Sequence, residues 1–115
     1  MSVRRGDVVM VDWIFSDRTG SKIRPAVVVQ ADFLNGLIAD TVLIAITRTT
    51  RGAASTEVVI DPAADAQAGL RRLSIASCNN FIMLDQALVR RTIGRLSPAT
   101  MQRIEIALRT ALGLP

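Results

Sequence analysis

The chain has 115 residues, of which 50% are hydrophobic, and a net charge of +4, with Lys22 the only lysine among its 14 basic residues. This length suits one domain spanning residues 1–115, and no apolar run reaches the roughly 20 residues that a membrane helix needs. The lack of histidine and the single cysteine, Cys78, exclude imidazole catalysis, an internal disulfide and the common zinc sites. We therefore expect a cytoplasmic protein without metal ion, cofactor or membrane partner, whose surplus apolar surface faces another subunit.

The hydrophobic pattern predicts a series of short strands followed by one helix. In the first strand, Val9, Val11 and Trp13 alternate with Val8 and Met10, which is typical of a strand with two distinct faces. An Asn-Gly pair predicts a turn after the second strand, and the segment 61–69 is expected to run over the surface. The predicted strands are residues 6–13, 25–30, 41–46 and 56–60, and either one long strand or two short ones within 73–84.

The final segment, residues 97–115, has clear helix signals at both ends. Ser97 suits the N-cap, Pro98 the first helical position, and Gly113 the position beyond the last turn. Together the elements predict a mainly β fold, a strongly curved antiparallel sheet or open barrel with the C-terminal helix packed on it. The apolar helix face that we expect to pack on the sheet consists of Met101, Ile104, Leu108, Ala111 and Leu112.

Arg24 and Pro25 stand directly before a run of β-branched residues. Proline fixes its own φ, lacks an N–H and pushes the preceding residue towards an extended conformation, so we expect Pro25 to begin a strand. If the strands 25–30 and 41–46 pair antiparallel, Arg24 and Thr47 come together at one edge of the sheet. The sequence thus predicts a guanidinium beside a hydroxyl at this edge.

Basic residues collect in two loops that leave from the same edge. Residues 15–24 and 48–55 together carry a net charge of +4, which equals that of the whole chain. Guanidinium groups bind phosphodiester oxygens, and long loops suit a single strand better than a duplex. The alternative is that these charges only solvate the loops, and that a base-composition bias explains the arginine content. The predicted nucleic-acid-binding cations are Arg18, Lys22, Arg48 and Arg51, and the candidates for base stacking are Trp13, Phe15 and Phe81.

Four motifs occur in the same order as in a known protein family. They are GDV at residues 6–8, RPAVVV at 24–29, an apolar strand that ends in Thr47, and IGRLS at 93–97. Over nearly its whole length, the chain resembles the MazF/PemK (Kid) family of toxin endoribonucleases.

This resemblance implies an SH3-like barrel with a C-terminal helix, and a homodimer whose groove binds single-stranded RNA. It also implies sequence-selective, metal-independent cleavage by the 2′-hydroxyl, which leaves a 2′,3′-cyclic phosphate and a 5′-hydroxyl and inhibits translation. The matching catalytic positions are Arg24 and Thr47. The implied protein partner is a small acidic antitoxin, whose tail folds over the cationic groove.

The chain departs from the family pattern in its last predicted strand. The Kid branch assigns catalytic work to an aspartate, and an arginine two residues earlier, where this chain has Asn79 and Ser77. We expect Asn79 and Asn80 to contact RNA by hydrogen bonds without an acid–base role, and a tight turn at this pair is the alternative. Two other functions stay open: a binding member of the family that has lost turnover, and a gyrase poison of the CcdB type. Such poisons use a C-terminal Trp, which this chain lacks.

Several other residues are expected to have simpler roles. Cys78 is predicted to be a small buried hydrophobe, and Ser74, the family's serine, to hydrogen-bond the backbone. Solvated surface charge is predicted for Arg71, Arg72, Arg90 and Arg91, and a contribution to partner binding for Arg4 and Arg5.

Overall fold

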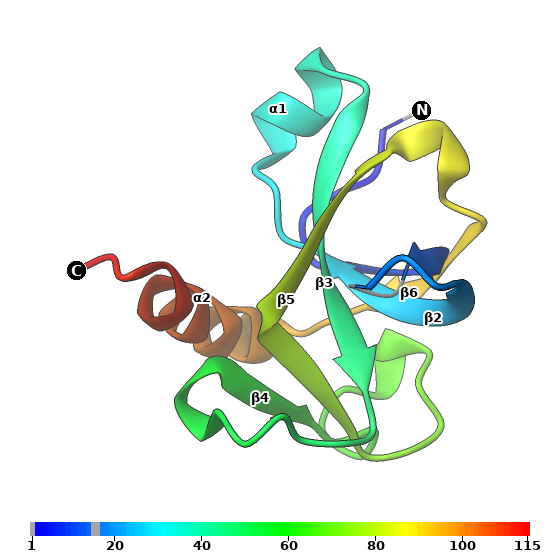
Figure 1. The fold of residues 1–115 in the computed structure, drawn as a ribbon. Helices are drawn as coiled ribbons and strands as arrows, with labels where there is room; N and C mark the ends of the chain where they lie inside the picture. The colour runs from blue at the N-terminus through cyan, green and yellow to red at the C-terminus, as the bar shows by residue number, and fades with distance from the viewer. Residues whose placement is uncertain (1, 15–16) are drawn as a thin grey trace.

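The computed structural model describes residues 2–14 and 17–115 and shows an antiparallel sheet with a helix packed against it (Figure 1). Its six strands lie in the order β4-β5-β3-β2-β1-β6, and the sheet curls strongly. The predicted fold class, a mainly β chain with a C-terminal helix on a curved antiparallel sheet, is confirmed. The elements are β1 (Asp7–Ile14), β2 (Ser21–Val28), α1 (Asp32–Leu37), β3 (Asp40–Thr47), β4 (Glu57–Ile60), β5 (Ser74–Asp85), β6 (Arg91–Arg95) and α2 (Pro98–Leu112).

Side chains on the two faces of β1 pack in two separate hydrophobic clusters, as the alternation of apolar residues in this strand predicts. Val8 packs in a cluster that includes the buried residues of α2, whereas Val9, Val11 and Trp13 pack in a cluster on the other face. Trp13 is only 4% exposed, so the prediction that its ring stacks on a base is wrong. Phe15, the second candidate for stacking, lies outside the described residues.

Pro25 lies inside β2, and it decides where the pairing with β3 stops. The carbonyl oxygen of Met10, which lies opposite Pro25, accepts the N–H of Arg90 on the far side of β1. The Met10–Pro25 pair is therefore not hydrogen-bonded, and the nitrogen of Pro25 faces β3. Because this nitrogen carries no hydrogen, the ladder between β2 and β3 ends at the pair Ala26–Ala45. The prediction that Pro25 begins a strand is wrong for β2 as a whole and holds only for its pairing with β3.

The long strand β5 is continuous but bends where its pairing with β3 shifts register. The pairing skips residues 78–80, which include Asn79 and Asn80 and form a bulge. Among the described residues other than glycine, a positive φ occurs at Arg18 and not at this asparagine pair. The alternative of a tight turn at Asn79-Asn80 is therefore wrong.

The connection from β2 to β3 contains the short helix α1 in place of the predicted Asn-Gly turn. Asn35 is buried in this helix, and its side-chain oxygen accepts hydrogen bonds from Gln30 Nε2 at 2.9 Å and Thr41 Oγ1 at 2.7 Å. The amide that resembles a turn signal in the sequence instead ties α1 to the beginning of β3. The turn prediction is wrong because these buried hydrogen bonds decide the local conformation.

The segment between β4 and β5 runs over the surface as expected, with most of residues 61–69 exposed, but Asp65 and Ala68 are buried. Asp65 is 4% exposed, and its carboxylate accepts the N–H of Ser97 at 2.7 Å and the hydroxyl of Thr100 at 2.5 Å. Burial opposes ionisation of Asp65, but these hydrogen bonds outweigh it and hold the pKa below its ordinary value.

Strand β6 was not predicted. The sequence pattern indicates no strand at residues 91–95, where the structure shows β6 paired with β1.

Helix α2 begins and ends as predicted. The hydroxyl of Ser97 accepts the N–H of Thr100, and Gly113 follows the last turn with φ 68°. Met101 and Ile104 are buried, but Leu112 is 57% exposed, so the predicted apolar face is one residue too long. Among the residues of 2–14 and 17–115, no helix is long and apolar enough to cross a membrane.

Cys78 is fully buried on β5 beside α2, as predicted for a small hydrophobe. Its sulfur lies 3.9 Å from the carbonyl oxygen of Ile104. Burial raises the pKa of the Cys78 thiol to about 11, so the thiol stays protonated at neutral pH. Cys78 therefore acts as a packing residue.

The close approach of β6 to the segment before β5 predicts a large effect at Gly94. A Cβ at this position would lie 2.2 Å from the backbone oxygen of Gln67, and backbone atoms cannot move aside cheaply. We expect Gly94→Ala to lower the free energy of unfolding by about 2 kcal/mol or more, measured by urea denaturation. Gly36→Ala, where nothing lies within 4 Å, is the control and should leave stability unchanged or raise it by up to about 1 kcal/mol. Equal losses in the two variants would contradict this account.

The buried carboxylate of Asp65 predicts a pH-dependent contribution to stability. We expect Asp65→Asn to lower the free energy of unfolding by about 1–3 kcal/mol at pH 7, and the exposed Asp61→Asn to cost less. The pKa of Asp65 is lowered by folding, so its stabilisation is complete above the ordinary value of 3.8 and is lost as the pH falls through the lowered value. In urea titrations, the gap between the parent chain and Asp65→Asn should shrink below pH 3.8. A gap that grows on acidification would show that the carboxylate is not held in its charged form.

Candidate functional site

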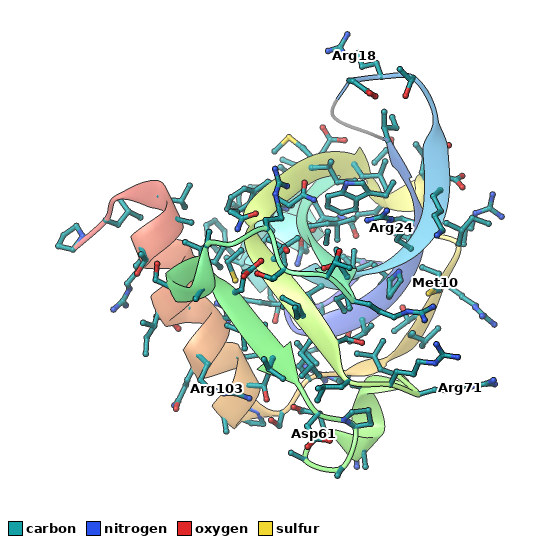
Figure 2. The ribbon with its side chains drawn as sticks, turned by 60° about the horizontal axis from the view of Figure 1, so that its bottom comes forward. Met10, Arg18, Arg24, Asp61, Arg71 and Arg103 are labelled. Carbon is teal, nitrogen blue, oxygen red and sulfur yellow. The ribbon has the colours of Figure 1, made fainter. Side chains whose placement is uncertain are left out.

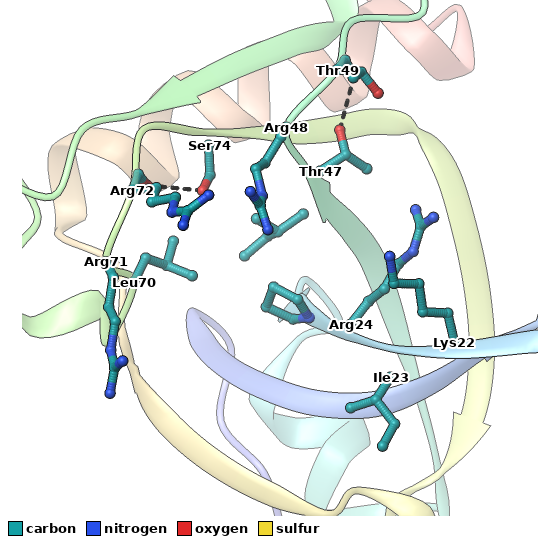
Figure 3. A pocket seen from close by; sticks show the side chains of 12 residues that line it. Lys22, Ile23, Arg24, Thr47, Arg48, Thr49, Leu70, Arg71, Arg72 and Ser74 are labelled. Atoms are coloured by element: carbon teal, nitrogen blue, oxygen red, sulfur yellow. Dashed lines mark hydrogen bonds between the residues drawn. The ribbon is translucent and has the colours of Figure 1, made fainter.

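A cavity of about 640 Å³ opens where β2 and β3 separate (Figure 3). Three segments form its walls: the first half of β2, the end of β3 with the loop after it, and the residues that lead into β5. The cavity exists because the ladder between β2 and β3 ends beside Pro25. Its lining residues are Lys22, Ile23, Arg24, Pro25, Ile46, Thr47, Arg48, Thr49, Leu70, Arg71, Arg72 and Ser74.

Arg24 and Thr47, the two predicted catalytic residues, both line this cavity. Continuing the register of the Ala26–Ala45 pair by two residues would place Arg24 opposite Thr47, but the strands no longer pair there. Both side chains are half-buried. The hydroxyl of Thr47 donates to the carbonyl oxygen of Thr49 at 3.0 Å, which leaves its oxygen able to accept another hydrogen bond.

The cavity concentrates positive charge without a neutralising acid. Of the described residues that line it, five are basic and none is acidic. Within the described part of the chain, the ion pairs lie elsewhere, at Arg90–Asp12, Arg95–Asp7 and Arg109–Glu105. Such a cluster of like charges attracts an anion with several oxygens. The five basic lining residues are Lys22, Arg24, Arg48, Arg71 and Arg72.

Arg71 and Arg72 contribute to this cavity, although the sequence suggested only solvated charge. They lead into β5, and the pairing of Thr47 with Ile75 brings that segment beside the end of β3. The hydroxyl of Ser74 donates to the carbonyl oxygen of Arg72 at 2.9 Å, which confirms the predicted structural role of Ser74. The sequence does show an Arg-Arg pair directly before the predicted strand within 73–84. It does not show which strand pairs with that one, and this pairing brings the two arginines to the cavity.

Two of the predicted nucleic-acid-binding cations do not line the cavity. Arg18 lies at the tip of the loop between β1 and β2, far from Arg24 (Figure 2), and has a φ of 60°. Arg51 lies in the loop after β3, where its N–H donates to the carboxylate of Glu57 at 2.7 Å. The bond from Arg51 and another from Thr50 hold the pKa of Glu57 below its ordinary value. Glu57 thus offsets part of the charge of a loop whose own sequence contains no acid.

Among the described residues, there is no group of three or more His, Cys, Asp or Glu side chains that could hold a metal ion. The chemistry that the cavity offers comes from guanidinium, ammonium and hydroxyl groups. These groups stabilise negative charge and orient oxygen atoms, and they are weak bases at neutral pH.

Comparison with known proteins identifies the family. A family model for the "PemK-like, MazF-like toxin of type II toxin-antitoxin system" matches residues 4–112. The chain belongs to this family.

Solved structures of PemK/MazF-like toxins share the fold over essentially the whole chain. An endoribonuclease in complex with its cognate antitoxin, from mycobacterial species, is 30% identical, with 99% of this chain and 98% of that chain covered and a TM-score of 0.81. An endoribonuclease from mycobacterial species is 29% identical, with 100% and 95% covered and a TM-score of 0.80. A MazE–MazF structure from Deinococcus radiodurans is 18% identical, covers 100% of both chains and has a TM-score of 0.76, which shows a common fold.

Asn79 and Asn80 of this PemK/MazF-like toxin lie outside the lining of the cavity that contains Arg24. The amide nitrogen of Asn79 donates to the hydroxyl of Thr56 at 2.8 Å. In the described part of the chain, Asn79 Oδ1 and the buried Ser77 Oγ have no hydrogen-bond partner. Phe81, the remaining candidate for base stacking, follows on β5 and is 36% exposed. The structure therefore brings Arg24, Thr47, Lys22 and Arg48 together and leaves the asparagine pair apart.

The hydrogen bonds of Glu57 predict that this carboxylate orders the loop after β3. We expect Glu57→Ala to speed exchange of the Arg51 amide hydrogen about tenfold, because that amide loses its acceptor. Hydrogen exchange followed by NMR measures this directly. The control is Glu105→Ala, which removes an acid that pairs with Arg109 on α2 and should leave Arg51 unaffected. An unchanged exchange rate in Glu57→Ala would show that the loop is ordered by other contacts.

Proposed function

We propose that this chain is a metal-independent endoribonuclease that cleaves single-stranded RNA at selected sequences and so inhibits translation. The proposal assigns catalysis to Arg24 and Thr47, within a single toxin domain of residues 1–115 that acts in the cytoplasm as a homodimer. The observation that carries it is the meeting of Arg24 and Thr47 in a cavity with five basic lining residues and no acidic one among those described. Family membership and the names of the mycobacterial relatives support it.

The charge of the cavity suits a phosphodiester. Guanidinium groups make charge-assisted, often bidentate hydrogen bonds to phosphate oxygens, and each neutralised phosphate adds salt-dependent affinity. Single-stranded RNA reaches recessed sites more readily than a duplex, and RNA carries the 2′-hydroxyl that the proposed reaction needs. The same cations would bind the acidic tail of an antitoxin, in line with the antitoxin complex of the 30% identical relative.

Each residue has a distinct role in the proposed reaction. The 2′-hydroxyl gives up its proton to solvent water as its oxygen attacks the phosphorus, and the bond from phosphorus to the 5′-oxygen breaks as that oxygen takes a proton from water. The guanidinium of Arg24 would neutralise the charge that develops on the phosphorane oxygens. The oxygen of Thr47, whose own hydrogen is directed to Thr49, would accept a hydrogen bond from the 2′-hydroxyl and so orient it. Since the chain has no histidine, positioning and charge would provide most of the rate enhancement.

Removing the guanidinium at position 24 should abolish cleavage without unfolding the protein. We expect Arg24→Ala to lower the rate at which a mixed-sequence RNA is cut by about 100-fold to 1,000-fold, and Thr47→Val to lower it less. The assay contains EDTA, and product sequencing identifies 5′-hydroxyl ends. Arg91→Ala, which removes an exposed cation from β6 outside the cavity, is the matched control, and circular dichroism verifies folding.

Wild-type rates in Arg24→Ala would rule out the assigned role. An absence of products from the parent chain, combined with retained RNA binding, would instead favour a binding member of the family that has lost turnover. Cleavage that needs a divalent cation would contradict the metal-independent mechanism.

A further inference from the structure

We infer that Arg48 and Arg72 form a second phosphate-binding subsite, which holds the RNA phosphate next to the one that is cut. The inference rests on the proposed function and deepens it, because it adds a substrate contact from the segment that leads into β5. It assigns a binding role to Arg72, which the sequence pattern marked only as surface charge.

The basic residues belong to all three segments that form the walls of the cavity (Figure 3). Lys22 and Arg24 lie together on β2, on the side of Thr47. Arg48, from the loop after β3, and Arg72, from the segment that leads into β5, point into the cavity from the side opposite β2. Since β2 and β3 no longer pair here, the space between the two groups is open.

The arrangement of charge favours an anion at each wall. Among the described residues, neither Arg48 nor Arg72 forms an ion pair, and no acidic side chain lines the cavity beside them. Two guanidinium groups that converge on one space repel each other unless an anion lies between them. A phosphate supplies that charge and several acceptor oxygens, which two guanidinium forks can share.

The size of the cavity also fits more than one phosphate group. Its volume of about 640 Å³ lies within the range of about 300–1,000 Å³ that holds ligands with many non-hydrogen atoms. A chain of two nucleotides places one phosphate at Arg24 and the next phosphate along the strand at the opposite wall. The reacting phosphate lies at Arg24, because Thr47, the hydroxyl proposed to orient the nucleophile, is on that side of the cavity.

Local structure distinguishes Arg72 from its neighbour Arg71. The hydroxyl of Ser74 holds the carbonyl oxygen of Arg72 at 2.9 Å, which fixes the backbone just before β5 begins. From that position the guanidinium of Arg72 points into the cavity, whereas the guanidinium of Arg71 points away from it (Figure 3). Because Arg71 also lines the cavity, the control for mutation of Arg72 is Arg91, an exposed arginine of β6 outside the lining.

The salt dependence of binding tests the subsite independently of cleavage. The probe is a mixed-sequence RNA with 2′-O-methyl groups, which has no 2′-hydroxyl for the proposed attack. We expect Arg72→Gln to weaken its binding about tenfold and to reduce the slope of log affinity against log salt by about 0.7, the value for one single-strand phosphate. Arg91→Gln, the control on β6 outside the cavity lining, should change the affinity at most about twofold and keep the slope, and Arg72→Lys should restore most of the slope.

Neutral backbone analogues locate the phosphate that Arg72 contacts. Once product sequencing has identified a cut site, a methylphosphonate replaces one phosphate at a time in the 2′-O-methyl version of that sequence. The parent chain should lose about tenfold in affinity at the scissile phosphate and again at one adjacent phosphate. Arg72→Gln should lose sensitivity at the adjacent phosphate alone, and its kcat on cleavable RNA should change less than its KM.

The outcomes separate this inference from the proposed function. If the parent chain does not cut RNA, the proposed function fails, and the salt slopes still decide whether Arg72 binds a phosphate. If Arg72→Gln and Arg91→Gln behave alike in the slope measurement, the subsite is overturned, even where cleavage by the parent chain is normal. A loss of antitoxin affinity in Arg72→Gln with unchanged RNA binding would also overturn it.

Discussion

The cavity depends on one missing hydrogen-bond donor, the nitrogen of Pro25. Because that nitrogen faces β3 and carries no hydrogen, the ladder ends at the pair Ala26–Ala45 and the two strands separate. Arg24 and Thr47, which continued pairing would place opposite each other, line the resulting space instead. A proline thus keeps the guanidinium and the hydroxyl accessible, while the rest of the sheet supplies a rigid frame.

The positive charge of the cavity is unfavourable in the isolated protein, because the cations repel one another, and it favours the binding of anionic partners. Five basic residues line the cavity, and no acid among the described residues lines it with them. Their mutual repulsion is relieved when phosphates or carboxylates bind. Under the proposed function, RNA and an acidic antitoxin would compete for the same charges, so that inhibition would need no separate regulatory site. Glu57 shows that the chain neutralises a neighbouring loop with an internal carboxylate but leaves the cavity itself cationic.

Strong local signals made part of the fold predictable from sequence. The two faces of β1 follow from the alternation of apolar residues, and the ends of α2 follow from Ser97, Pro98 and Gly113. Strand β6 lacks such a signal because it is short, flanked by arginines and held by backbone pairing with β1. Helix α1 also escapes prediction, since the side chain of Asn35 is buried and hydrogen-bonds to Gln30 and Thr41, which overrides the Asn-Gly preference for a turn.

The sequence by itself determined the family pattern and the main strands, and it predicted that Arg24 and Thr47 come together, because strands that follow each other in the chain often pair antiparallel. Tertiary structure decided which charges share the cavity. It brought the segment of Arg72 beside the end of β3, turned Arg18 away and buried Trp13. These outcomes depend on strand pairing and packing between residues far apart in the chain, and the local spacing of residue types does not indicate such contacts.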